Sequence, residues 1–91
     1  MAHTEATSAA LIARVRRITG QLHAVERLLE EGASCSAILQ QIAGARGAIN
    51  GLLDEVVEDH LREHVVRPEL DAAARAAGAE ELMAVIRRYS K

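Results

Sequence analysis

The chain has 91 residues, of which 49% are apolar, and its formal net charge at pH 7 is −2. This length predicts a single domain over residues 1–91, and so short a chain leaves much apolar surface uncovered, which favours self-association. The acidic net charge excludes a uniformly basic domain, and no apolar run is long enough to cross a bilayer or to act as a signal peptide. We therefore expect a cytoplasmic protein without a membrane partner.

The apolar residues are mainly Ala, Leu, Val and Ile, and only 1% of the chain is aromatic. This composition favours helices packed on helices, so we predict an all-α fold. The first predicted helix covers residues 8–31, begins near Thr7 or Ser8 and ends before Gly32, which can adopt the left-handed conformation that closes helices. Its apolar positions recur at alternating spacings of four and three residues: Leu11, Val15, Ile18, Leu22, Val25 and Leu29.

The second predicted helix covers residues 34–66, with Ser34 as its cap and Pro68 preventing its continuation. Its apolar stripe consists of Ile38, Ile42, Ala45, Ile49, Leu52 and Val56. Three glycines lie in its middle, at 44, 47 and 51. Because glycine is unfavourable inside a helix, they indicate either a close approach of another backbone or simple tolerance in a long helix.

An alanine-rich stretch follows Pro68, and after Gly78 we predict a short amphipathic helix. Its apolar side is formed by Leu82, Val85, Ile86 and Tyr89. The predicted architecture is a long antiparallel helical hairpin followed by a short C-terminal helix.

A pair of histidines, His60 and His64, lies four residues apart near the end of the second helix. This spacing stacks two imidazoles on one helix face, within reach of the same ion. Two solvated polar residues near a helix end would give the same pattern, so further ligands are needed to identify a metal site.

The single cysteine, Cys35, lies at the other end of the same predicted helix. A straight helix separates it from His60 by roughly 37 Å, at a rise of about 1.5 Å per residue. If two such helices pack antiparallel and cross near Gly47 and Ala48, Cys35 of one chain lies opposite His60 of the other. A site built in this way occurs twice in a dimer and involves the glycines at the crossing.

His3, near the N-terminus, is a candidate further ligand. One thiolate, up to three imidazoles and the terminal amine near Ala2 suit late transition metals. Nickel and cobalt are favoured if the N-terminal segment raises the coordination number toward six, whereas a closed tetrahedral site would favour zinc.

Three sequence segments resemble the CsoR/RcnR/FrmR family of small helical repressors, and the resemblance weakens after Pro68. They are RVRRITGQL at residues 14–22, CSAILQQIAGARGAINGL at residues 35–52 and HLREH at residues 60–64. The resemblance implies a dimer of dimers, in which two hairpins form a four-helix bundle and two dimers form a tetramer. It also implies that members sense copper, nickel and cobalt, formaldehyde or persulfide at equivalent positions.

The ligand set His3, Cys35, His60 and His64 resembles that of the nickel- and cobalt-responsive branch. Copper and persulfide sensors of the family use cysteine pairs, which this chain lacks. Formaldehyde sensors are similar to it, but they have a proline in place of Ala2 and an acidic residue in place of His64. A formaldehyde response through Cys35 and the N-terminus therefore stays as the alternative.

Double-stranded operator DNA is the expected partner. Three residues of the first helix, Arg14, Arg17 and Gln21, share a face, and the resemblance implies DNA contact in this region. Arg16 lies in the same basic cluster, and Arg46 is a candidate from the second helix. An ordinary solvated basic face is the alternative interpretation.

We expect the metal-free protein to bind its operator and nickel or cobalt to release it by changing the shape of the tetramer. An enzyme using Cys35 is not expected, because no acid or oxyanion-stabilising group accompanies the thiol. A metal-storage protein would share the ligands but would have no use for the arginines.

Overall fold

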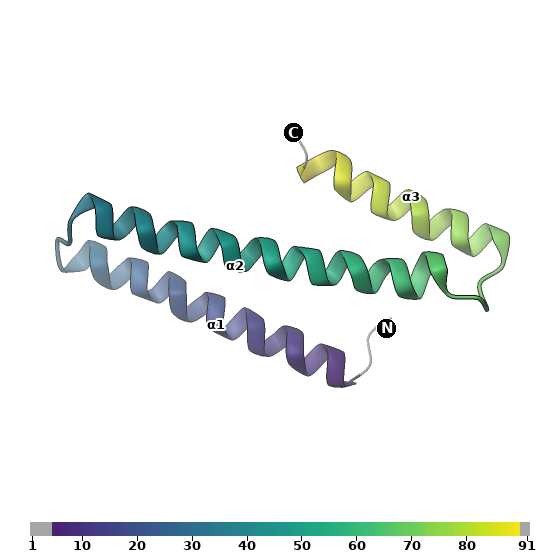
Figure 1. The fold of residues 1–91 in the computed structure, drawn as a ribbon, viewed down its shortest axis with the longest axis horizontal. Coiled ribbons are helices and arrows are strands. Elements are labelled where there is room, and N and C mark those ends of the chain that lie inside the picture. The colour runs from purple at the N-terminus through teal and green to yellow at the C-terminus, as the bar shows by residue number, and fades with distance from the viewer. Residues whose placement is uncertain (1–4, 90–91) are drawn as a thin grey trace. The chain divides into compact units, whose positions relative to one another are not determined.

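The protein is built from helices, and the computed structural model describes residues 5–89. The helices are α1 (Glu5–Glu30), α2 (Cys35–Leu61) and α3 (Ala72–Tyr89), which Figure 1 labels. A π-helical segment, η1 (Arg62–Val66), directly continues α2. Residues 5–89 contain no strand, which confirms the all-α prediction. None of the described helices combines the length and apolar character needed to cross a membrane.

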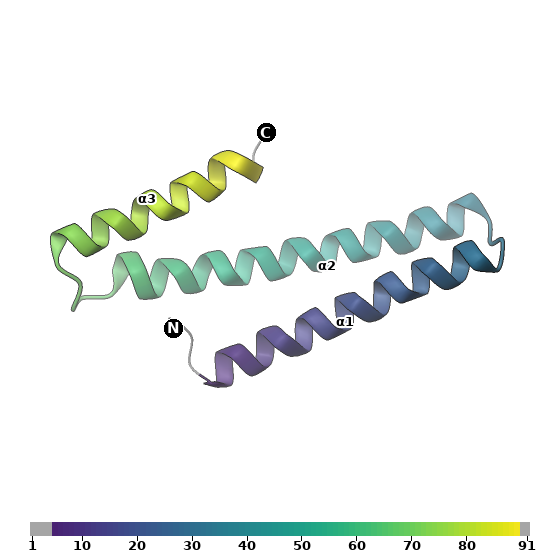
Figure 2. The same cartoon turned by 180° about the vertical axis from the view of Figure 1, so that it is seen from behind.

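The described chain divides into two compact units, which are treated separately below. The N-terminal unit contains α1 and the part of α2 that ends at Leu53, and the C-terminal unit begins at Asp54 and contains the end of α2, η1 and α3. The N-terminal unit is a hairpin in which α1 and the first part of α2 lie side by side in both views (Figures 1 and 2). The Gln41 side-chain amide donates a hydrogen bond of 3.3 Å to the carbonyl oxygen of Gln21 across this hairpin.

The turn of the hairpin follows the two local signals predicted for it. Gly32 has φ +68°, and the amide of Ala33 donates to the carbonyl oxygen of Leu28, so α1 ends in the left-handed closing turn. Ser34 caps α2 by accepting a hydrogen bond of 3.1 Å at its Oγ from the amide of Ala37. α1 itself begins at Glu5, before the caps proposed at Thr7 or Ser8.

The apolar stripes of both helices divide into two sets, each with a seven-residue repeat. One set is buried or half-buried and consists of Leu11, Ile18, Val25, Ile38, Ala45 and Leu52. The other set, which we call the outward series, is 38% to 60% exposed and consists of Val15, Leu22, Leu29, Ile42, Ile49 and Val56. Only Ile18 and Ala45 are buried apolar residues in the described chain, so one chain covers only part of the predicted helix faces.

The second predicted helix reaches Val66 as expected, but its last five residues are π-helical. The helical conformation ends at Arg67, whose ψ is 124°. This extended conformation is the one that a following proline imposes, so Pro68 ends the helix as predicted.

The C-terminal helix is longer than predicted, because α3 begins at Ala72 and not after Gly78. Asp71 caps it, with its Oδ1 accepting a hydrogen bond of 2.7 Å from the amide of Ala74. Alanine has the highest helix propensity, so the alanine-rich stretch continues the helix through the glycine. Gly78 is buried and lies inside α3, where its packing outweighs its poor helix propensity.

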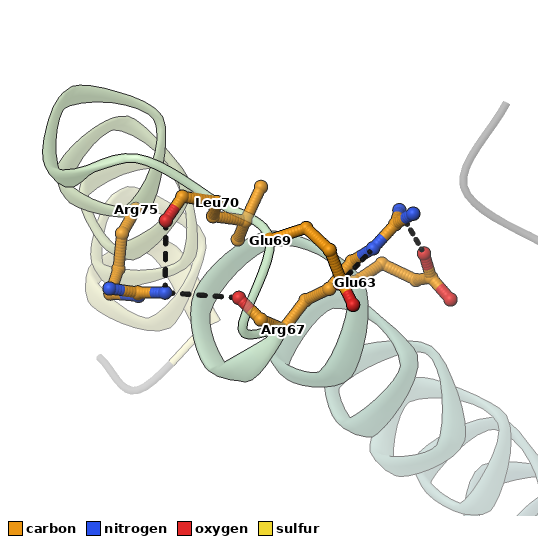
Figure 3. Close-up of polar contacts among 5 residues, drawn as sticks. All are labelled: Glu63, Arg67, Glu69, Leu70 and Arg75. Carbon is orange, nitrogen blue, oxygen red and sulfur yellow. Dashed lines mark hydrogen bonds and ion pairs between the residues drawn. The ribbon is translucent and has the colours of Figure 1, made fainter.

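The connection between η1 and α3 is held by Arg75 (Figure 3). Its guanidinium donates hydrogen bonds to the carbonyl oxygens of Val65 (2.7 Å), Arg67 (3.0 Å) and Leu70 (3.2 Å). These carbonyls belong to the end of a helix and a tight turn, where backbone acceptors lack helical partners. Arg75 therefore ties the first turns of α3 to the end of η1.

Candidate functional site

The two histidines of the predicted chelate lie side by side in the C-terminal unit. His60 is in the last turn of α2 and His64 is in η1. Their ring centroids are 4.8 Å apart, the ring planes are inclined by 42°, and both residues are half-buried. π-helical turns are rare and occur often at functional sites. The four-residue spacing thus brings the imidazoles together, as predicted.

The backbone of α3 contacts both histidines at one residue. Nε2 of His60 lies 2.8 Å from the carbonyl oxygen of Gly78. A Cβ atom at Gly78 would lie 2.8 Å from the carbonyl carbon and 2.9 Å from the Cβ of His64, and it would overlap the His64 carbonyl oxygen. Gly78 was not predicted to belong to the site. The only signal in the sequence is a glycine within an alanine-rich stretch.

Acidic side chains near the histidines are paired with arginines. Nη2 of Arg62 lies 3.0 Å from Oδ1 of Asp59 and 3.9 Å from Oε2 of Glu58. Arg67 pairs with Glu63 at 3.5 Å and with Glu69 at 2.9 Å, as Figure 3 shows. These ion pairs engage the carboxylates that flank the histidine pair.

The pKa of the Glu69 carboxyl is lowered from its ordinary value. A hydrogen bond from its own backbone amide lowers the pKa, and the hydrogen bond from Arg67 lowers it further. The carboxylate form is therefore favoured in the folded protein.

The other predicted ligands are Cys35 and His3. Cys35 is the first residue of α2, and its thiol is free and exposed. His3 lies outside the described residues. Among the side chains that the structure describes, no three of His, Cys, Asp or Glu are gathered within reach of one ion. By donor type, an imidazole nitrogen or a thiolate suits nickel, cobalt or zinc.

The basic face predicted on α1 belongs to the N-terminal unit. Arg14, Arg17 and Gln21 line a hollow with a volume of about 160 Å³, together with Ile18 and Ala48. The half-buried Arg14 extends over α2, where its Nη1 lies 2.8 Å from the position that a Cβ at Gly51 would occupy.

The remaining members of the predicted DNA-binding set differ in their surroundings. Arg16, Arg17 and Arg46 are exposed, and Arg46 does not line the hollow. The side-chain oxygen of Gln21 is buried and has no hydrogen-bond partner within the described chain. The face thus combines exposed cations with one unsatisfied acceptor.

Comparisons with known proteins agree on one family. Residues 7–88 match the family model described as metal-sensitive transcriptional repressor. The chain is 50% identical to an uncharacterised protein in the bioA 5′ region of Serratia marcescens and 42% identical to the transcriptional repressor RcnR of Salmonella typhimurium, each over 100% of both chains.

A solved structure also resembles this one. It is a histidine-for-glutamate variant of the formaldehyde-responsive regulator FrmR from Salmonella enterica serovar Typhimurium, with 47% identity and a TM-score of 0.89 over 96% of this chain and 98% of that chain. The sequence matches and this structural match support the resemblance found in the three sequence segments. The chain therefore belongs to the metal-sensitive transcriptional repressors, a family of transcription regulators and not of enzymes.

Proposed function

We propose that this protein is a cytoplasmic repressor that binds operator DNA in its metal-free state and is released by nickel or cobalt bound between subunits. The observation that carries the proposal is the pairing of His60 and His64, whose ring centroids are 4.8 Å apart. Two imidazoles placed in this way offer a chelate for one ion. The 42% identity to the repressor RcnR over the whole chain supports the same branch of the family.

The outward series supports an oligomer as the working form. Its six apolar side chains repeat every seven residues along α1 and α2 and are 38% to 60% exposed in one chain. A seven-residue apolar repeat is typical of a helix face that packs against other helices. We propose that a second copy covers it in a four-helix bundle and that two such dimers form a tetramer.

The same dimer would complete the metal site. In an antiparallel pair of α2 helices crossing at Gly47 and Ala48, Cys35 of one chain is level with His60 of the other, since the two positions are equidistant from the crossing. Each site would then take Cys35 from one chain and His60 and His64 from its partner, with His3 as a further ligand. A contribution from the N-terminal segment favours nickel or cobalt, whereas zinc suits a site of four ligands.

The basic face supplies the proposed contact with operator DNA. Arg14, Arg17 and Gln21 line one hollow, and Arg16 and Arg46 add exposed positive charge. Arginines of this kind mainly neutralise phosphates, so binding should weaken steeply as the salt concentration rises. A tetramer would repeat these contacts, so that several basic faces could bind phosphates of one duplex although each chain has an acidic net charge.

Metal and DNA are proposed to favour different shapes of the tetramer. A coupling of about 1 to 3 kcal/mol between the two sites weakens operator binding by roughly 5- to 150-fold. The same coupling weakens metal binding when DNA is bound, because linkage is reciprocal.

The test is a gel shift with a labelled DNA fragment taken from upstream of the gene encoding this chain. Nickel or cobalt should abolish the shift for the natural protein and for His23→Gln, which changes an exposed histidine outside the site. The same metals should leave the gel shift of the His64→Gln variant intact. A shift of the natural protein that survives excess nickel and cobalt would contradict metal-dependent release.

A formaldehyde-responsive repressor is the second candidate, favoured by the 47% identity and TM-score of 0.89 to the FrmR variant. The exposed Cys35 thiol would add to the carbonyl carbon of formaldehyde, and the N-terminal amine would then displace the hydroxyl as water, leaving a one-carbon bridge. Formaldehyde in place of metal in the same gel shift separates the candidates. Release by formaldehyde together with a mass increase of one carbon atom would favour this alternative.

A further inference from the structure

The contact between α3 and the histidine pair defines the proton position on one imidazole. Nε2 of His60 lies 2.8 Å from the carbonyl oxygen of Gly78. A carbonyl oxygen can only accept a hydrogen bond, so Nε2 must carry the proton. In a neutral imidazole the lone pair is then on Nδ1. The contact therefore selects one tautomer of His60 and leaves Nδ1 available as a donor atom.

The absence of a side chain at residue 78 is what allows this contact. A Cβ there would overlap the His64 carbonyl oxygen and would lie 2.9 Å from the His64 Cβ, closer than atoms in proteins approach. Helix propensity alone would favour alanine, as at most positions before it. Gly78 is also the one buried residue of α3. Close packing against His64 thus accounts for the glycine.

Arg75 holds this part of α3 in place. Arg75 lies one turn before Gly78 in α3. Its guanidinium donates hydrogen bonds to three backbone carbonyl oxygens, those of Val65, Arg67 and Leu70. α3 is consequently tied to η1 at two places, by Arg75 near its start and by Gly78 one turn later.

We propose that Gly78 is a positioning residue for the histidine pair: its carbonyl orients His60 as the Nε2–H tautomer, and its lack of a side chain admits α3 against His64. Only the role of Nδ1 as a metal ligand rests on the proposed metal-binding function. The tautomer of His60 and the packing of Gly78 do not depend on it. Groups that hold the second nitrogen of a ligating histidine fix both its tautomer and its ring orientation, and their loss typically weakens metal binding by about 10- to 100-fold.

The first test uses the full chain without metal. Long-range proton–nitrogen NMR correlations of ¹⁵N-labelled protein, recorded at mildly alkaline pH, distinguish the two tautomers. The His60 signals are assigned by their absence in His60→Gln. We expect His60 to be in the Nε2–H form. An Nδ1–H form, or a rapid mixture of both, would overturn the proposal. Because no metal is added, this result is independent of whether nickel binds.

The second test compares Gly78→Ala with Gly20→Ala, a helical glycine where an added Cβ meets no atom within 4 Å. Nickel affinity is measured by competition with a coloured chelator, and helix content by circular dichroism. We expect Gly78→Ala to lose the single tautomer and to bind nickel about 10- to 100-fold more weakly, while Gly20→Ala retains both. Unchanged tautomer and affinity in Gly78→Ala would contradict the proposal. If the natural protein bound no nickel, the proposed function would fail, and the tautomer would still decide the role of Gly78.

Discussion

The two units of the chain are stabilised in different ways. The hairpin of α1 and the first part of α2 is closed by local signals at Gly32 and Ser34, yet half of its predicted apolar face is exposed. The C-terminal unit instead makes specific contacts within one chain, through Arg75 and through Gly78. In the proposed oligomer the hairpin would depend on a second copy, whereas the contact of α3 with η1 is formed by the chain itself.

The largest effect is expected from truncating the outward series. Leu22 is 49% exposed in one chain. If it is equally exposed in the working protein, Leu22→Ala should hardly change the free energy of unfolding. If a second copy covers it, the free energy of unfolding should fall by roughly 2–5 kcal/mol per chain. Urea unfolding at two protein concentrations measures this, because an oligomer gains stability with concentration. Glu26→Ala, at an exposed position of α1, is the control.

An intermediate effect is expected in the C-terminal unit from Arg75→Met, which removes three hydrogen bonds to backbone carbonyls. Hydrogen bonds from a charged donor contribute about 1.5–3 kcal/mol, and partial exposure of Arg75 keeps the total near the lower value. Amide hydrogen exchange should become faster in α3 and stay unchanged in α1.

Arg88→Met, at an exposed position near the end of α3, provides the matched control for this exchange experiment. Equal acceleration of exchange in both helices would show that the two units do not differ in the way described above.

The smallest effect is expected from Glu69. Its lowered pKa means that the folded state favours the carboxylate more than the unfolded state does. The resulting stability is present above the ordinary carboxyl pKa and is lost as the pH falls through the lowered value. The natural protein should therefore melt slightly above Glu69→Gln at neutral pH, and the two melting temperatures should converge in strong acid. A difference in melting temperature that is constant at all pH values would contradict this. Glu80→Gln, at an exposed position of α3, is the control.

Local signals explain which parts of the fold could be predicted from the sequence. Gly32, Ser34 and Pro68 act on their immediate neighbours, so the end of α1, the start of α2 and the end of η1 followed from them. The start of α3 was placed too late because Gly78 looked like a helix boundary, whereas its packing against His64 keeps it inside the helix. The periodicity located the apolar faces but could not show how each would divide between its own chain and the exposed surface.

The candidate site shows the same limit. The adjacency of His60 and His64 follows from a spacing of four residues along one helical segment. The partner of His60 is eighteen residues away along the chain and depends on how α3 packs against η1. The joint role of Cys35 and these histidines stays a prediction, since it involves another chain.

The exposed thiol of Cys35 has a practical consequence for handling this protein. The sequence contains one cysteine, so any disulfide that it forms must join two molecules. Air oxidation would accordingly appear as a covalently linked species on a non-reducing gel. It would also remove the thiolate from titrations, so preparations need a reductant that does not itself coordinate metal ions.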